Sequence, residues 1–114
     1  MDLYNELQQK CKLLDNSVRI LRKSGSDYAK AYTDYRIALA KELVKLKAEG
    51  YAITLANDIA RGKPEIAHLK FEEISKEAIY KANLESINAL KLEIKIIQEQ
   101  LNKEYGGNEW NKKL

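Results

Sequence analysis

The sequence predicts an all-α protein, arranged as an elongated antiparallel helical hairpin or a coiled-coil bundle. Apolar residues recur at alternating spacings of three and four along most of the chain, which is the period of an amphipathic helix. The chain has 114 residues, of which five are Gly and one is Pro, so there are few points at which a helix has to end. We expect residues 1–105 to form a single helical domain and residues 106–114 to form a flexible C-terminal tail.

The first arm of the hairpin is predicted to be broken into two helices. Asp2 is a suitable N-cap for the first helix. Gly25 suits a helix end, and Ser26 or Asp27 is able to cap a new helix after it. The apolar stripe of the first helix consists of Leu3, Leu7, Cys11, Leu14, Val18 and Leu21, so we expect Cys11 to be a small buried side chain.

The second helix of this arm is expected from Asp27 to Glu49, and Gly50 follows as its terminator. Its apolar stripe consists of Tyr28, Tyr32, Tyr35, Leu39, Leu43 and Leu46. The spacing of three and four continues across Gly25, as though the helix were not interrupted. The sequence therefore leaves two arrangements open, a nearly collinear pair of helices with a kink and a full reversal of the chain.

A short connector helix and one long helix follow. Thr54 is a candidate cap for a connector helix from Leu55 to Arg61 that ends at Gly62. Pro64 suits the first turn of the long helix, which runs to about Tyr105 and would extend about 60 Å. A more compact three-helix bundle is the alternative architecture.

The long helix carries two sets of apolar residues that do not share one heptad phase. The first set contains Ala67, Phe71, Ile74 and Ala78, and the second contains Ile87, Leu90, Ile94, Ile97 and Leu101. A phase slip around residues 81–86 is therefore expected, where the buried face rotates or one packing partner replaces another.

Composition and charge exclude several classes of protein. The 20 basic and 17 acidic residues give a net charge of +3 and are interleaved, so no strongly basic face is expected. A single cysteine forms no disulfide within the chain. No apolar run approaches the roughly 20 residues that cross a bilayer, and the first residues do not resemble a signal peptide. We expect a cytoplasmic protein without membrane contact.

The sequence offers no recognisable catalytic or metal-binding constellation. His68 is the only histidine and has no cysteine near it, so it is expected on the surface or in an interface. Glu72, Glu73 and Glu77 gather three carboxylates beside two lysines, which is typical of a solvated charged face. We therefore expect neither enzyme activity, nor a metal, nor a cofactor.

Candidate partner-binding residues are aromatic or cationic. The three tyrosines lie at helical spacing, which favours packing over base stacking, but rings that stay partly exposed make good protein anchors. Trp110 is a candidate hydrophobic anchor for another subunit. The candidates are Tyr28, Tyr32, Tyr35, Arg36, Arg61, Lys63 and Trp110.

Two segments of the chain resemble small uncharacterised helical proteins from the early regions of phages and prophages of Gram-positive bacteria. These segments read NELQQKCKLLDNSVRILRKSGSDYAKAYTDYRIAL and IAHLKFEEISKEAIYKANLESINALKLEIKIIQEQLNKEYG. The resemblance implies a setting in recombination, replication or the blocking of host defence, and brings no catalytic motif with it.

The favoured function is a non-enzymatic helical protein that binds another protein, from the host or the phage, and that also self-associates as a homo-oligomer. One such function is the inhibition or modulation of nucleic-acid machinery, including host defence. The first alternative is an accessory nucleic-acid-binding protein of recombination or replication that uses Lys41, Lys45, Arg61, Lys63 and Lys70. The second is an oligomer that sequesters a small ligand.

Overall fold

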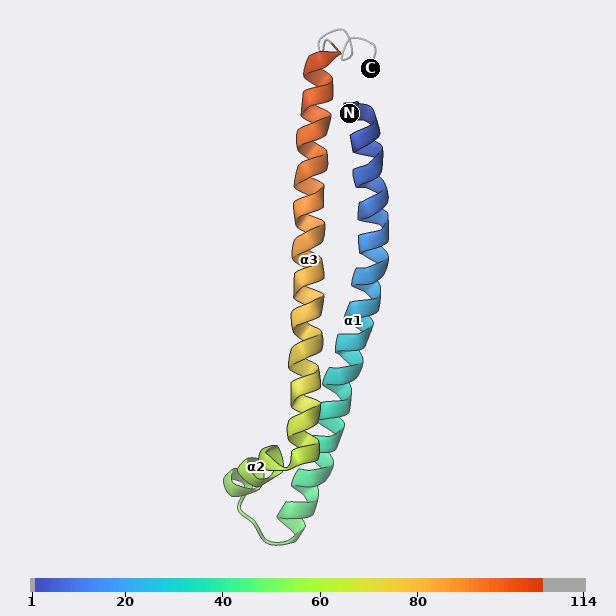
Figure 1. Ribbon diagram of the computed structural model, residues 1–114. Helices are drawn as coiled ribbons and strands as arrows, with labels where there is room; N and C mark the ends of the chain where they lie inside the picture. The colour runs from blue at the N-terminus through green and yellow to red at the C-terminus, as the bar shows by residue number, and fades with distance from the viewer. Residues whose placement is uncertain (1, 106–114) are drawn as a thin grey trace. The chain divides into compact units, whose positions relative to one another are not determined.

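The computed structural model describes residues 2–105, and every regular element in that range is a helix. Helix α1 spans Leu3–Ala48, α2 spans Ile53–Gly62 and α3 spans Pro64–Glu104 (Figure 1). The all-α class, the short connector helix and the long last helix are thereby confirmed. No helix among these residues combines the length and the apolar character needed to cross a membrane.

The chain packs as two compact units. The first contains the described residues up to Arg22 and those from Ala82 onward, and the second contains Lys23–Lys81. Within each unit α1 and α3 run antiparallel, since residues further along α1 meet residues further back along α3. Each unit is thus hairpin-like in its helix packing, as the sequence predicts.

Helix α1 corrects the prediction of a broken first arm. It continues without interruption through Ser24, Gly25 and Ser26, so neither a new cap nor a chain reversal occurs there. Gly25 lies against the ring of Tyr80, and a Cβ atom at Gly25 would stand 3.2 Å from Tyr80 Cε1. The glycine therefore permits close approach of α3 rather than ending α1, a role that depends on a residue 55 positions away.

The ends of α1 follow the predicted local signals. The backbone N–H of Tyr4 donates to Asp2 Oδ1 at 3.0 Å, which is an N-cap hydrogen bond. At the other end, Gly50 adopts φ +97°, the N–H of Tyr51 donates to the Leu46 carbonyl and the N–H of Gly50 donates to the Lys47 carbonyl. This pair of bonds is the Schellman motif, for which glycine is the favoured residue.

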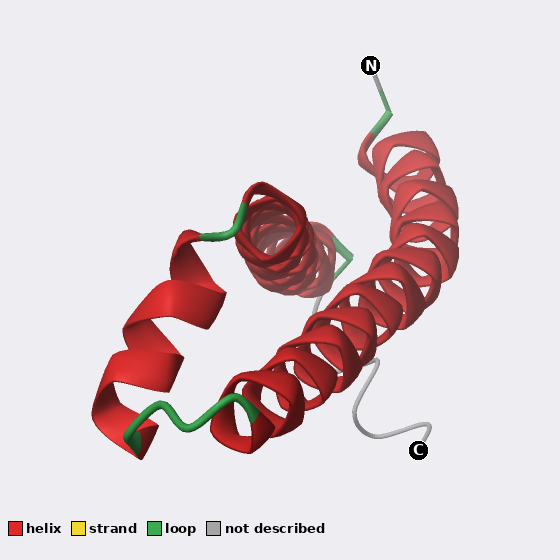
Figure 2. Cartoon of the chain, turned by 90° about the horizontal axis from the view of Figure 1, so that it is seen from below, coloured by secondary structure: helices red, strands yellow, loops and turns green. Residues whose placement is uncertain are grey.

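The connector helix begins earlier than predicted. Ala52 occupies the N-cap position of α2 and makes no side-chain cap, so the prediction that Thr54 caps this helix is wrong. The Ala52 carbonyl instead accepts the Ala56 N–H at 2.8 Å. At the other end the helix stops at Gly62 and α3 starts at Pro64, as predicted. Figure 2 shows α2 joined by short loops to α1 and to α3.

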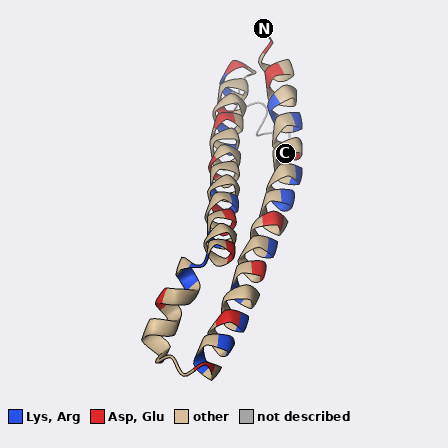
Figure 3. Cartoon of the chain, turned by 60° about the horizontal axis from the view of Figure 1, so that its bottom comes forward, with Lys and Arg blue, Asp and Glu red and all other residues tan. Residues whose placement is uncertain are grey.

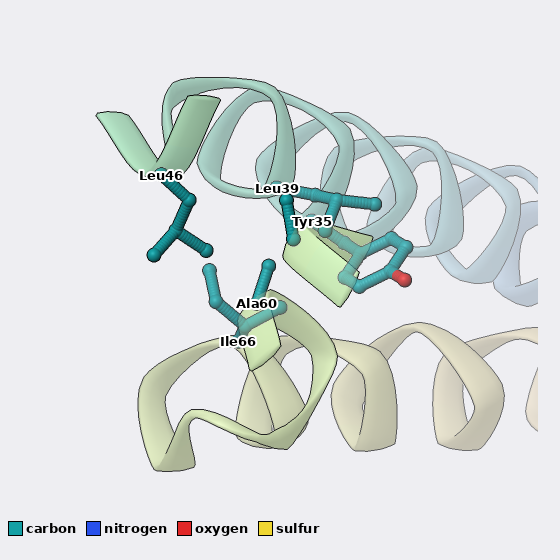
Figure 4. Close-up of a cluster of buried hydrophobic side chains, with 6 residues drawn as sticks. Tyr35, Leu39, Leu46, Ala60 and Ile66 are labelled. Atoms are coloured by element: carbon teal, nitrogen blue, oxygen red, sulfur yellow. The ribbon is translucent and has the colours of Figure 1, made fainter. Parts of the chain in front are cut away.

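The core of the second unit forms where α2 meets α1 and α3. Its buried residues are Tyr35, Leu39, Leu46, Ala56, Ala60 and Ile66. Leu39 and Leu46 of α1 point toward Ala60 of α2 and Ile66 of α3 (Figure 4). Alanines at the α2 positions allow the short helix to lie close to its neighbours, because no long side chain holds the backbones apart.

The packed face of α3 keeps one heptad phase, so the predicted slip around residues 81–86 does not occur. A series of buried and half-buried positions with spacings of three and four runs along it: Ile66, Leu69, Glu73, Lys76 and Tyr80 in the second unit, and Asn83, Ile87, Leu90, Ile94, Ile97 and Leu101 in the first. Glu72, Ser75 and Glu77 beside this series are half-buried as well. The first apolar set of the helix therefore lies on a different face. Its members Ala67, Phe71, Ile74 and Ala78 are all exposed.

The packed face of α1 in the first unit also differs from the prediction at one position. Leu3, Leu7, Leu14 and Leu21 are half-buried, but Cys11 is exposed. Its neighbour Lys10 takes the seam position, with its aliphatic stem half-buried and its ammonium group 2.9 Å from the carboxylate of Glu93. Heptad spacing between Leu7 and Leu14 places Lys10 on the packed face, but a search for apolar residues selects Cys11 instead.

Candidate protein-binding surface

Polar pairs join α1 to α3 in the second unit at regular intervals. The Tyr28 hydroxyl donates to Glu77 Oε2 at 2.6 Å, the Lys70 ammonium lies 4.8 Å from the centre of the Tyr35 ring, and Lys63 pairs with Glu42. Each advance of seven residues along α1 is matched by seven residues back along the chain, from Glu77 and Lys70 in α3 to Lys63, the residue directly before α3. We call these three pairs the polar ladder, and they fix one antiparallel register for the two helices.

The Tyr28–Glu77 pair of the polar ladder shifts the pKa values of both its members. The hydrogen bond to Glu77, with burial and the negative charge of Glu77 as smaller causes, raises the pKa of Tyr28 to about 12. The same bond lowers the pKa of Glu77, and Lys81, whose ammonium lies 2.9 Å from Glu77 Oε1, lowers it further. The ring of Tyr80 packs beside Tyr28, with centroids 6.1 Å apart. Tyr28 therefore has a structural role in the helix contact.

The carboxylates on α3 are less uniform than the sequence indicates. Glu73 is only 6% exposed, so it does not belong to a solvated face. Its carboxylate accepts a hydrogen bond from Lys70 at 2.9 Å, and this bond raises the pKa of Lys70. Among the described residues, no group of three or more His, Cys, Asp or Glu side chains is arranged to hold a metal ion. The buried carboxylate is thus accounted for by its lysine partner.

The structure separates the candidate residues predicted on α1. Tyr28 and Tyr35 belong to the helix contact, since Tyr35 is buried in the core of the second unit and Tyr28 is half-buried. Tyr32 and Arg36 are exposed. Of the three tyrosines in the predicted aromatic stripe, Tyr32 is thus the exposed one, and the packing interpretation holds for Tyr28 and Tyr35.

The predicted candidates near the connector also divide. Arg61 is exposed and, with Tyr35, Ile66, Ala67 and Lys70, lines a hollow of about 200 Å³. Lys63 is half-buried in its pair with Glu42, which raises the pKa of Lys63 and lowers the pKa of Glu42. Trp110 lies outside the described residues.

Two of the five cations of the nucleic-acid alternative are compensated by acidic partners. Lys63 and Lys70 are both paired with carboxylates of the same unit. Basic and acidic residues are interspersed along α1 and α3 (Figure 3). A polar hollow of about 310 Å³ in the second unit likewise combines three lysines with three acids. On its α1 side Lys23 pairs with Asp27 and Lys30 pairs with Asp34. Such balanced surfaces attract polyanions weakly.

One exposed apolar surface on α3 was missed as a binding candidate. Ala67, Phe71, Ile74 and Ala78 follow one another at spacings of four, three and four on α3, and we call this set the Phe71 stripe. Phe71 is 64% exposed and Ile74 is 57% exposed. The sequence signal for this surface was the difference in heptad phase between the two apolar sets of α3. That difference marks a second apolar face rather than a rotation of the first.

Comparisons with known proteins give no further constraint. The chain matches no protein-family model, no curated protein and no solved structure.

Proposed function

We propose that the chain is a non-enzymatic helical protein that acts by binding another protein through the Phe71 stripe. The observation that carries this proposal is the exposure of Phe71 and Ile74, two large apolar side chains on one face of a well-packed helix. Single exposed apolar residues are common on protein surfaces, whereas a row of them at helical spacing is typical of an interaction site.

The geometry of the stripe favours a helical partner. Spacings of four, three and four define a narrow seam like that of a coiled coil, into which the side chains of a second helix pack. Ala67 and Ala78 at its two ends leave room for a close approach of the partner backbone. The partner surface is therefore an amphipathic helix that offers Leu, Ile or Phe side chains between Phe71 and Ile74.

The resemblance to phage and prophage proteins extends the proposal to a setting. The partner then belongs to the nucleic-acid machinery of the host or the phage, host defence included, and its inhibition or modulation is the consequence of binding. A location in the bacterial cytoplasm belongs to the same proposal. Self-association through the Phe71 stripe is proposed as well, because one copy of the stripe is itself an amphipathic helical face.

The test compares three versions of the full chain as bait in the cells that naturally produce it, with nuclease added. They are the unmodified chain, the double variant Phe71→Gln and Ile74→Gln, and the control Val44→Gln, which alters an exposed apolar residue of α1. Glutamine keeps helix propensity, and all three chains should be equally helical by circular dichroism. Light scattering on each purified chain gives its mass.

For the unmodified chain and the Val44→Gln control we expect a stoichiometric protein partner or the mass of a dimer. In the double variant the affinity should fall at least tenfold, which corresponds to about 1.4 kcal/mol of binding free energy. Equal binding by all three chains would exclude the Phe71 stripe. Binding that disappears with nuclease and falls steeply with salt would replace the proposal with the nucleic-acid alternative.

A further inference from the structure

The first unit has an apolar groove between the start of α1 and the end of α3. It is lined by Tyr4 and Leu7 of α1 and by Gln98, Leu101, Asn102 and Tyr105 at the end of α3, and its volume is about 350 Å³. This volume is at the lower end of the range for ligand pockets, about 300 to 1,000 Å³. The groove therefore has room for one large aromatic side chain.

The walls of this groove are held in place by the helix ends. Asp2 caps the turn that contains Tyr4, and the N–H of Tyr105 donates to the Leu101 carbonyl at 3.0 Å, which continues the hydrogen bonding of α3 to the last described residue. Tyr4 and Tyr105 are nevertheless exposed, and Leu7 and Leu101 are half-buried. Two exposed aromatic rings thus stand at the rim of a half-buried apolar floor.

The chain itself continues directly from the rim of the groove. Tyr105 is followed by Gly106 and Gly107, and Trp110, the only tryptophan, comes five residues after Tyr105. Five residues span at most about 17 Å when extended, which is enough to return to a groove of which Tyr105 is itself a wall. Two consecutive glycines lower the conformational free energy that a reversal of direction requires, because glycine adopts both signs of φ.

We propose that this groove binds the indole ring of Trp110 from the same chain. The ring lies between Tyr4 and Tyr105 and covers Leu7 and Leu101. An aromatic side chain of this size buries about 150 to 250 Å² of surface, which makes it the member of the segment with the most to gain from the groove. This contact is independent of the Phe71 stripe, which lies in the other unit.

The test uses the intrinsic fluorescence of the full chain, since its one tryptophan reports on Trp110 alone. In the folded protein we expect emission shifted to shorter wavelength, and acrylamide quenching at least about twofold weaker, than in the urea-unfolded protein. Both properties should stay unchanged when the protein is diluted a hundredfold, because the contact is within one chain.

Two variants connect this signal to the groove. The double variant Tyr4→Gln and Tyr105→Gln should raise quenching by at least about twofold, whereas the control Tyr32→Gln, an exposed tyrosine of the second unit, should leave it unchanged. Emission from the unmodified protein that already resembles the unfolded chain would overturn the proposal. A protected tryptophan whose quenching is unchanged in the groove variant would also overturn it. So would a tryptophan that becomes exposed on dilution, because the groove would then bind a second copy of the chain.

Discussion

The two units pack the same two helices by different means. In the first unit the packed faces are aliphatic, with buried Ile87 and Ile97 on α3 and half-buried leucines on α1, and an ion pair joins Lys10 to Glu93. In the second unit the polar ladder joins α1 to α3, and α2 supplies a third layer. The same heptad spacing thus supports two different kinds of contact.

This difference teaches what each kind of contact specifies. An aliphatic seam stabilises helix association strongly but tolerates neighbouring registers, because one leucine or isoleucine resembles the next. A polar pair is satisfied in one register only, since a shift leaves a charged or hydroxyl group without its partner. The first unit therefore depends mainly on filled volume, whereas the second combines a filled core with matched partners.

The largest expected effect concerns filled volume in the first unit. Ile97 is 5% exposed, and its neighbour Ile96 is 48% exposed on the same helix. Ile97→Ala should lower the free energy of unfolding by about 2 to 5 kcal/mol, because it leaves a cavity between the helices. Ile96→Ala should be neutral or slightly stabilising, since alanine is the better helix former. Urea denaturation followed by circular dichroism measures both; equal losses in the two variants would contradict an aliphatic core at Ile97.

An intermediate effect concerns the matched partners of the second unit and depends on pH. The pKa of Tyr28 is raised from 10.0 to about 12, so the stabilisation from its hydrogen bond is complete below pH 10 and is lost as the pH rises through 12. The pKa of Glu77 is lowered from 4.5, so its part is complete above pH 4.5 and is lost as the pH falls below that value. The stability difference between the unmodified protein and Tyr28→Phe should be greatest between these limits.

Two measurements check this pH dependence. Chemical denaturation of both proteins across the pH range gives the stability difference, which should shrink at both extremes. The ultraviolet absorbance of tyrosinate should show one of the seven tyrosines ionising near pH 12, and this step should be missing from Tyr28→Phe. A pH-independent stability difference would mean that ring packing, rather than the Glu77 hydrogen bond, is what Tyr28 contributes.

The smallest effect concerns Gly25. Alanine is favoured over glycine inside a helix by about 1 kcal/mol, but a Cβ atom here would stand 3.2 Å from the Tyr80 ring. We expect Gly25→Ala to change stability by less than about 0.5 kcal/mol, because the two effects oppose each other. In a Tyr80→Ala background the same change should stabilise by the full amount of about 1 kcal/mol. A double-mutant cycle measures the coupling, and additive effects would show that the glycine does not serve the helix contact.

The sequence by itself determined the helical class and most helix ends. Asp2, Gly50 and Pro64 act where the sequence predicts, because a cap, a left-handed residue or a proline imposes its geometry within a single turn. The long last helix follows for the same reason, since nothing between Pro64 and Glu104 interrupts it. These features need no information from distant residues.

Only the tertiary structure decided which helix face is packed. Phe71 is more apolar than Glu73, and Cys11 more apolar than Lys10, yet Glu73 and Lys10 take the seam positions. Lys10 finds its partner, Glu93, on the opposite helix, whereas buried Glu73 is paired with Lys70 of its own helix. Gly25 is likewise a helix end by local rules and a packing site once Tyr80 lies against it. The physical reason is that propensity acts over neighbouring residues, whereas burial is shared between segments that meet only in the folded chain.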